Sequence, residues 1–210
     1  MSAFHKIRLL LADDHFVVRM GLAASLRLEP DFEVVAEAAT AEEAIAFYKQ
    51  HRPDVAVLDW RLPDLTGVEV TATIRQFDPK ARILILSAFS GEEDVFRVVQ
   101  AGAESYLLKN ARRAEIVQAI RTLHAGGQYF PPEISAIFAA RLRREELTAR
   151  EKSVLVEIVK GSSNKEIGSL LEITESAVKL HVTHLLQKLQ AKDRTHAATI
   201  AIQRGIVHLE

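Results

Sequence analysis

The sequence contains no cysteine. Disulfide bonds, catalysis by a thiolate and zinc bound by cysteine are therefore excluded. No stretch approaches the ~18 consecutive apolar residues of a membrane span. The apolar run from Ile7 to Ala12, interrupted by Arg8, is too short for a signal peptide and is followed by two acids. We therefore expect a cytoplasmic protein with no membrane partner.

The length of 210 residues suits two domains, each large enough to bury its own core. The formal net charge is −1, but the two parts of the chain differ in sign. Residues 1–125 carry 15 basic and 18 acidic side chains, whereas residues 126–210 carry 12 and 10. A basic bias between Ser176 and His196 suits the phosphate backbone of a nucleic acid, although a solvated helix face would show much the same bias.

Residues 1–125 alternate short apolar runs with helical patterns, which predicts a parallel sheet. The predicted strands are Leu9–Ala12, Val34–Ala36, Val55–Leu58, Ile83–Leu86 and Tyr106–Leu108. Capping boxes mark three helix starts between them, at Thr40/Glu43, Thr66/Glu69 and Ser90/Glu93. The pattern predicts a flavodoxin-like, doubly wound five-stranded sheet of order 2-1-3-4-5, with its binding crevice at the carboxyl ends of strands 1 and 3.

Polar side chains stand where four of these strands end: Asp13 and Asp14, Asp59, Ser87, and Lys109. Three carboxylates at one edge of a sheet repel each other, so a divalent cation is expected among them, and oxygen ligands favour Mg²⁺. A bound cation in turn suits an anionic substrate. Asp59 as nucleophile, the acid pair with its ion, and the donors Ser87 and Lys109 together fit phosphoryl transfer. Each residue alone has a simpler explanation as a helix cap, a turn residue or a surface lysine.

Residues 7–124 resemble the receiver domain of two-component response regulators. The resemblance implies that Asp59 is the phospho-acceptor and that Mg²⁺ is held by Asp13, Asp14, Asp59 and the backbone carbonyl of Arg61. It also implies a conformational switch formed by Ser87, Tyr106 and Lys109. Many receivers have proline after the lysine, whereas this chain has Asn110. A cis peptide bond is therefore not expected there.

A domain boundary is predicted at residues 126–132, where two glycines and two prolines cannot continue a helix. Ile134, Ile137, Phe138 and Leu142 then fall at helical spacing and predict a short linker helix with an apolar stripe. We place the linker at residues 126–145, between a receiver domain at 1–125 and a second domain at 146–210.

The last part of the chain shows four helical patterns and no strand-like alternation. Thr148/Glu151 and Ser163/Glu166 form capping boxes, and Gly161 separates the first two helices. The second and third helices, joined by a turn through Glu172 and Thr174, predict a helix-turn-helix. Gly168 inside the second helix costs ~1 kcal/mol relative to alanine, which suggests a close packing contact there.

The third helix of this domain has a buried stripe and an opposite polar face. The stripe consists of Val178, Val182, Leu185, Leu186 and Leu189. The opposite face carries Ser176, Leu180, Thr183, His184 and Gln187, flanked by Lys179 and Lys188. An apolar side chain such as Leu180 among polar ones suits contact with a thymine methyl, and a lysine suits guanine or phosphate oxygens. A single exposed leucine is also normal on any protein surface.

This region resembles the LuxR-type DNA-binding domain through residues 147–151, 164–167 and 178–181. Together with a receiver, it is similar to the NarL/FixJ family of response regulators. The resemblance implies base contacts from Lys179, Leu180 and Thr183, and phosphate contacts from Asn164, Lys165 and Ser176. We add His184 from the same face and Lys188 from its flank. Ala177 stands where threonine is usual, and some relatives carry lysine in place of Thr183, so the target sequence is not specified.

We therefore predict a transcription factor, not an enzyme, whose sequence-specific binding to promoter DNA is controlled by a histidine kinase that phosphorylates Asp59. A homodimer on paired half-sites is expected once Asp59 is phosphorylated. One alternative is a Mg²⁺-dependent phosphatase with an aspartyl-phosphate intermediate at Asp59. It lacks a general acid two residues later, where Arg61 stands. A second alternative is a scaffold that binds proteins and no DNA.

Overall fold

The structure of this protein is a computed structural model in which residues 6–208 are described. The outer ends of both predicted domains, residues 1–5 and 209–210, lie outside the described residues. The chain divides into two units: one comprises residues up to 89 together with 95–135, and the other comprises 90–94 together with 136–210. The predicted boundaries at 125 and 145 stay a prediction.

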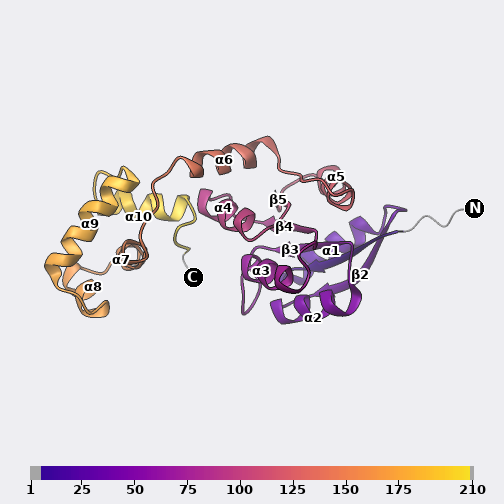
Figure 1. Cartoon of the computed structure of the whole chain (residues 1–210), viewed down its shortest axis with the longest axis horizontal. Coiled ribbons are helices and arrows are strands. Elements are labelled where there is room, and N and C mark those ends of the chain that lie inside the picture. Colours follow the sequence, from indigo (N-terminus) through magenta and orange to yellow (C-terminus); the bar gives the residue numbers. More distant parts are fainter. Residues whose placement is uncertain (1–5, 209–210) are drawn as a thin grey trace, which may run out of the picture. The chain divides into compact units, whose positions relative to one another are not determined.

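The first unit is built on a five-stranded parallel sheet of order β2-β1-β3-β4-β5, as the sequence predicts (Figure 1). The strands are β1 (Ile7–Ala12), β2 (Phe32–Ala38), β3 (Val55–Asp59), β4 (Ile83–Ser87) and β5 (Ser105–Leu108). Every residue of β3 and β4 is buried, which explains their uninterrupted apolar runs. Ala12 pairs with Leu58 and Asp59 pairs with Leu86, so the carboxyl ends of β1, β3 and β4 meet at one edge.

Five helices accompany the sheet: α1 (Phe16–Leu26), α2 (Ala41–His51), α3 (Gly67–Phe77), α4 (Glu92–Gln100) and α5 (Arg113–His124). Side chains of α1 and α5 pack with Leu9, Leu11, Val57 and Leu84 in one apolar cluster. Successive strand residues point to opposite faces, so the buried Leu10, Ala56, Leu58 and Ile85 face the other side of the sheet. The sheet therefore has a core on each face, which is typical of a doubly wound fold.

The three capping boxes predicted between the strands have three different outcomes. The box at Thr66 and Glu69 is complete. Thr40 accepts a hydrogen bond from the N–H of Glu43, whereas the Glu43 carboxylate accepts from Ala39, one residue before the predicted partner. The box predicted at Ser90/Glu93 is wrong, because α4 begins at Glu92 and the Glu93 carboxylate accepts from Arg141.

The remaining helices are α6 (Pro132–Leu142), α7 (Ala149–Val159), α8 (Asn164–Leu170), α9 (Glu175–Leu189) and α10 (Arg194–Gln203). The capping boxes at Thr148/Glu151 and Ser163/Glu166 are present as predicted. Helices α7 to α10 share an apolar core that includes Val154, Ile167, Val178 and Leu185. In the predicted linker helix α6, Ile134 is buried, whereas Leu142 is exposed. None of the helices within residues 6–208 could span a membrane.

Gly168 makes the close contact that its place inside a helix suggested. A Cβ atom added at Gly168 would lie 2.8 Å from the carbonyl oxygen of Ile173, in the turn between α8 and α9. Ile173 also donates its backbone N–H to the carbonyl of Gly168 at 2.9 Å. The absence of a side chain therefore lets the two arms of the helix-turn-helix approach closely.

We predict that Gly168→Ala lowers the free energy of unfolding of the second unit by about 1–3 kcal/mol, because the new methyl group would crowd backbone atoms. The matched control is Gly21→Ala, inside α1, where an added Cβ meets no atom within 4 Å. That change should be neutral or stabilising by about 0.5–1 kcal/mol. Calorimetric unfolding of both variants measures the difference. A Gly168→Ala protein as stable as wild type would show that the close approach is not required.

Candidate functional site

Three carboxylates and a histidine meet at the carboxyl edge of the sheet. Ligand atoms of Asp13, Asp14, His15 and Asp59 all lie within 4.8 Å of one another. Asp13 and Asp59 are buried, at 3% and 4% exposure, whereas Asp14 and His15 are exposed. The paired ends of β1 and β3 bring these residues together, as the strand order predicted. The edge therefore carries an acidic cluster with two buried members, Asp13 and Asp59, and two exposed ones, Asp14 and His15.

Lys109 lies directly between the two buried acids. Its Nζ is 2.8 Å from Asp13 Oδ2 and 2.7 Å from Asp59 Oδ2. Burial alone would lower the pKa of Lys109, but the hydrogen bonds and charges of the two acids outweigh it and raise that pKa. Burial is the main reason that the pKa of Asp59 is raised; the charge of Asp13 raises it further, and Lys109 opposes both. One cation thus partly compensates two buried carboxylates, and Asp14 adds a third negative charge nearby.

These groups fit a hard divalent cation, because three carboxylates with a single lysine leave net negative charge among oxygen donors. The loop after Asp59 stays close to these acids. The Arg61 backbone N–H hydrogen bonds to Asp59 and lowers its pKa, and Arg61 pairs with Thr66 in an isolated bridge. Gly67 closes the loop: a Cβ there would lie 2.4 Å from the Asp59 carbonyl oxygen. The backbone of Arg61 is therefore held next to the acids.

Ser87 and Tyr106, two of the predicted switch residues, are joined through the segment that follows β4. Both are fully buried. The Ser87 hydroxyl accepts from the N–H of Phe89 at 2.9 Å, and the Tyr106 phenol donates to the carbonyl of Phe89 at 2.7 Å. The third predicted switch residue, Lys109, donates its backbone N–H to the Ser87 carbonyl at 2.8 Å. The structure thus connects all three residues by hydrogen bonds.

Two participants were not among the predicted site residues. His15 joins the acid cluster, with Nδ1 2.6 Å from Asp14 Oδ1. Its position directly after the two aspartates was the available signal. Phe89 links the switch residues through its backbone, and nothing in the local sequence pattern marks it.

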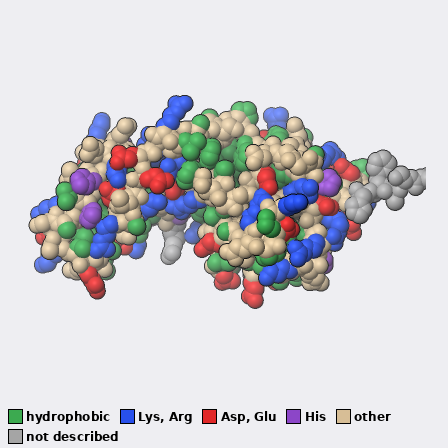
Figure 2. All heavy atoms as spheres, in the orientation of Figure 1, with side chains coloured by type: hydrophobic (Ala, Val, Ile, Leu, Met, Phe, Trp, Pro, Cys, Tyr) green, Lys and Arg blue, Asp and Glu red, His purple; other side chains and the backbone are tan. Residues whose placement is uncertain are grey.

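In the second unit, the predicted buried stripe and exposed face of α9 are both present. Val178, Leu185 and Leu189 are buried, with Val182 and Leu186 packed against the same core. Ser176, Lys179, Leu180, Thr183 and His184 are exposed on the opposite face. Leu180 is 56% exposed, and Lys179 forms an ion pair with Glu175 at 2.9 Å. Figure 2 shows histidine and basic side chains at the surface in the region of α8 and α9.

Comparison with known proteins agrees with both parts of the chain. Residues 9–121 match the model of the response regulator receiver domain, and residues 145–201 match that of bacterial regulatory proteins of the luxR family. Response regulator protein VraR of Staphylococcus aureus is 37% identical over 206 residues, which cover 96% of this chain and 99% of VraR. The chain belongs to the response regulator family.

Two solved structures illustrate the likeness. The response regulator ChrA of a heme-sensing two-component system is 33% identical over 96% of this chain and 99% of ChrA, with a TM-score of 0.59. RcsB in complex with DNA is 20% identical over 95% of this chain and 99% of RcsB, with a TM-score of 0.71. The second likeness concerns the fold only. A receiver and a LuxR-type domain in one chain make this response regulator a phosphorylation-controlled transcription factor.

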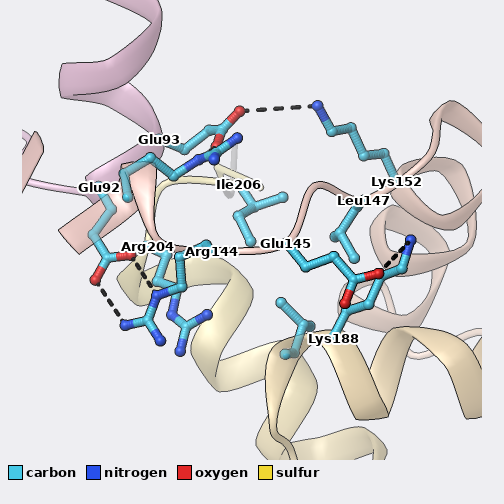
Figure 3. A pocket seen from close by; sticks show the side chains of 11 residues that line it. Glu92, Glu93, Arg144, Glu145, Leu147, Lys152, Lys188, Arg204 and Ile206 are labelled. Atoms are coloured by element: carbon cyan, nitrogen blue, oxygen red, sulfur yellow. Dashed lines mark hydrogen bonds and ion pairs between the residues drawn. The ribbon is translucent and has the colours of Figure 1, made fainter. Parts of the chain in front are cut away.

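One residue of the predicted DNA-binding set, Lys188, is set apart from the others. Its side chain is 17% exposed, and its Nζ lies 2.9 Å from Glu151 Oε2 and donates to the carbonyl of Glu146 at 3.0 Å. Figure 3 shows it lining a pocket of the second unit, with its ammonium group directed at Glu145. Other charges around this pocket are also paired, as in Glu92 with Arg144. Lys188 thus has acidic partners within the response regulator itself.

Asn164 and Lys165, the predicted phosphate contacts on α8, begin that helix immediately after its capping residue Ser163. Lys165 is exposed and Asn164 is half-buried. The amino end of α8 carries the positive end of a helix dipole, which suits a phosphate group. These two residues and the exposed face of α9 belong to the two arms of the helix-turn-helix.

Proposed function

We propose that Asp59 accepts a phosphoryl group from a sensor histidine kinase in the cytoplasm. The observation that carries the proposal is a buried carboxylate at the end of β3, bonded to Lys109 and grouped with two further acids. One Asp59 carboxylate oxygen would attack phosphorus and form a P–O bond. The P–N bond to the donor histidine would break, and its electron pair would leave with the imidazole.

We assign Mg²⁺ to the site, held by the carboxylates of Asp13, Asp14 and Asp59 and by the backbone carbonyl of Arg61. When bound, Mg²⁺ neutralises negative charge on the carboxylates and on the transferring phosphoryl group. Lys109 already lies against Asp59 and would pair with a phosphoryl oxygen. The Ser87 hydroxyl, buried at the adjacent strand end, would donate a hydrogen bond to another oxygen. Tyr106 would respond to a shift of Ser87, because its phenol is bonded to the carbonyl of Phe89 and the N–H of Phe89 is bonded to the Ser87 hydroxyl.

We propose that the protein acts by binding promoter DNA and not by turning over a substrate. Lys179, Leu180 and Thr183 would face bases in the major groove, with His184 beside them. Asn164, Lys165 and Ser176 would contact phosphates. Lys188 would lie at the edge of this surface, where its ammonium group is also paired with Glu151. A homodimer formed on phosphorylation would read two half-sites related by a two-fold axis.

The first expected outcome concerns Asp59. Asp59→Asn should abolish labelling by radioactive acetyl phosphate in the presence of Mg²⁺, because an amide oxygen is a much weaker nucleophile than a carboxylate. The matched control is Asp64→Asn, an exposed acid in the same loop, which should be labelled like wild type. The wild-type label should be released by hydroxylamine, as an acyl phosphate is. An Asp59→Asn protein that still takes up one phosphate per chain would refute the assignment.

The second expected outcome concerns Lys179. Lys179→Ala should weaken DNA binding, measured by gel shift at two salt concentrations. A base contact would cost about 1–3 kcal/mol and relax specificity at one position. A phosphate contact would weaken all sequences alike and reduce the salt slope by about one unit. Unchanged affinity at both salt concentrations would remove Lys179 from the interface.

Lys160→Ala is the matched control for Lys179→Ala. Lys160 is 62% exposed and paired with Glu157 on α7, much as Lys179 is 64% exposed and paired with Glu175 on α9. Both substitutions remove one exposed, ion-paired lysine from the same unit. A difference between their DNA affinities would therefore report on the position of the lysine. Equal weakening by both would indicate a general effect of charge. No binding of wild type to any duplex would favour a protein-binding scaffold.

A further inference from the structure

Phe89, in the segment between β4 and α4, makes three separate contacts around the acceptor site. Its N–H donates to the Ser87 hydroxyl at 2.9 Å, and its carbonyl accepts from the Tyr106 phenol at 2.7 Å. Its ring meets the ring of Trp60 edge-on, with centroids 5.2 Å apart and planes at 62°. Trp60 follows Asp59 directly in the chain. Phe89 therefore connects two switch residues to the residue next to the phospho-acceptor.

The ring of Trp60 offers a fixed surface for this contact. Trp60 is 4% exposed, its backbone N–H donates to the Leu86 carbonyl at 2.9 Å, and its backbone carbonyl accepts from the N–H of Gly67 at 2.7 Å. By contrast, Ala88 and Ser90 on either side of Phe89 are exposed. The aromatic pair is thus a side-chain contact between this segment and the loop after Asp59.

The hydrogen bond from Phe89 determines what the Ser87 hydroxyl can do. A serine hydroxyl has one proton to donate and two lone pairs that accept. Because a lone pair of Ser87 is occupied by the N–H of Phe89, the hydroxyl keeps its proton for a different acceptor. Ser87 follows Leu86, the strand partner of Asp59. A phosphoryl oxygen on Asp59 is an acceptor of the required kind on the neighbouring strand end.

We propose that Phe89 is a positioning residue for phosphorylation of Asp59. Its ring, held on Trp60, fixes the segment so that its N–H orients the Ser87 hydroxyl and its carbonyl holds the Tyr106 phenol. The inference rests on the proposed role of Asp59 and adds a residue that acts on the reaction through Ser87 without touching the phosphoryl group.

Phe89→Ala tests the ring alone, because alanine keeps both backbone hydrogen-bonding groups. The maximal rate of labelling by acetyl phosphate with Mg²⁺ should fall about two- to tenfold, the range expected for loss of one aromatic pair. The half-saturating donor concentration should not change, since the proposed role of the ring is to orient Ser87 and not to bind the donor. Phe89→Tyr should restore the rate. Phe89→Leu repeats the comparison with less loss of apolar volume.

Two controls separate positioning from general stability. Phe47→Ala removes a ring from another edge-on pair of the same unit, with His51 at 6.1 Å, and should label at the wild-type rate. In a Ser87→Ala background, Phe89→Ala should cause no further slowing, because the hydroxyl that it orients is already gone. Trp60, the only tryptophan in the sequence, supplies a second readout. Its emission should change when beryllium fluoride and Mg²⁺ are added, and the change should be smaller in Phe89→Ala.

The outcomes distinguish this inference from the proposal on which it rests. A wild-type chain that takes no label at Asp59 overturns both. A labelled wild type with an unchanged rate in Phe89→Ala overturns the role of Phe89 alone. So does equal slowing by Phe89→Ala in the presence and absence of the Ser87 hydroxyl, because that result would reflect a structural role.

Discussion

The burial of like charges at the carboxyl edge of the sheet is the constraint on which the rest of the acceptor site depends. Asp13 and Asp59 are almost fully buried at the ends of adjacent strands, and burial, together with the charge of Asp13, raises the pKa of Asp59. Lys109, directly after β5, reduces the free-energy cost of burying these charges by bonding to both Asp13 and Asp59. A buried carboxylate pair is costly without a compensating cation, and one lysine leaves net negative charge on three carboxylates. The site is therefore poised for a divalent ion and an anionic group.

The backbone around this edge is shaped to keep the charges in place. The loop after Asp59 returns so closely that a Cβ atom at Gly67 would lie 2.4 Å from the Asp59 carbonyl oxygen. The capping box at Thr66 and Glu69 then starts α3. On the next strand, Ser87 and Tyr106 are joined through Phe89. A change of charge at Asp59 thus has a short, hydrogen-bonded route into the segment that leads to α4. This is a local electrostatic change acting on a defined loop.

The sequence alone predicted the sheet order, the five strands and the convergence of acids with Lys109, because parallel strands end at a common edge whatever their loops do. It also predicted the buried stripe of α9 and the tight packing at Gly168. The ends of the strands were predicted less accurately. β2 runs from Phe32 to Ala38, beyond the predicted Val34–Ala36, because its outer residues pair with β1. Periodicity does not reveal which residues at a strand end are hydrogen-bonded.

Two features depended on contacts between residues distant in the sequence and escaped local patterns. Glu93 fits a capping box with Ser90 by spacing, but the strong charge of Arg141, 48 positions later, takes its carboxylate instead. Lys188 lies beside the reading face by helical geometry, yet the buried Glu151 on α7 draws its ammonium group inward. A charge-assisted hydrogen bond replaces the capping interaction in the first case and gives Lys188 a partner inside the protein in the second; a DNA contact from Lys188 stays a prediction.

We propose that charge at Asp59 controls DNA binding by this response regulator. The most direct measurement is the Kd for promoter DNA of the wild-type chain before and after complete phosphorylation, beside Asp59→Asn treated in the same way. Phosphorylated wild type should bind about tenfold or more tightly, a shift of roughly 1.4 kcal/mol in the equilibrium, and Asp59→Asn should not respond. A fully phosphorylated wild type with an unchanged Kd, or an Asp59→Asn protein that responds equally, would contradict the claim.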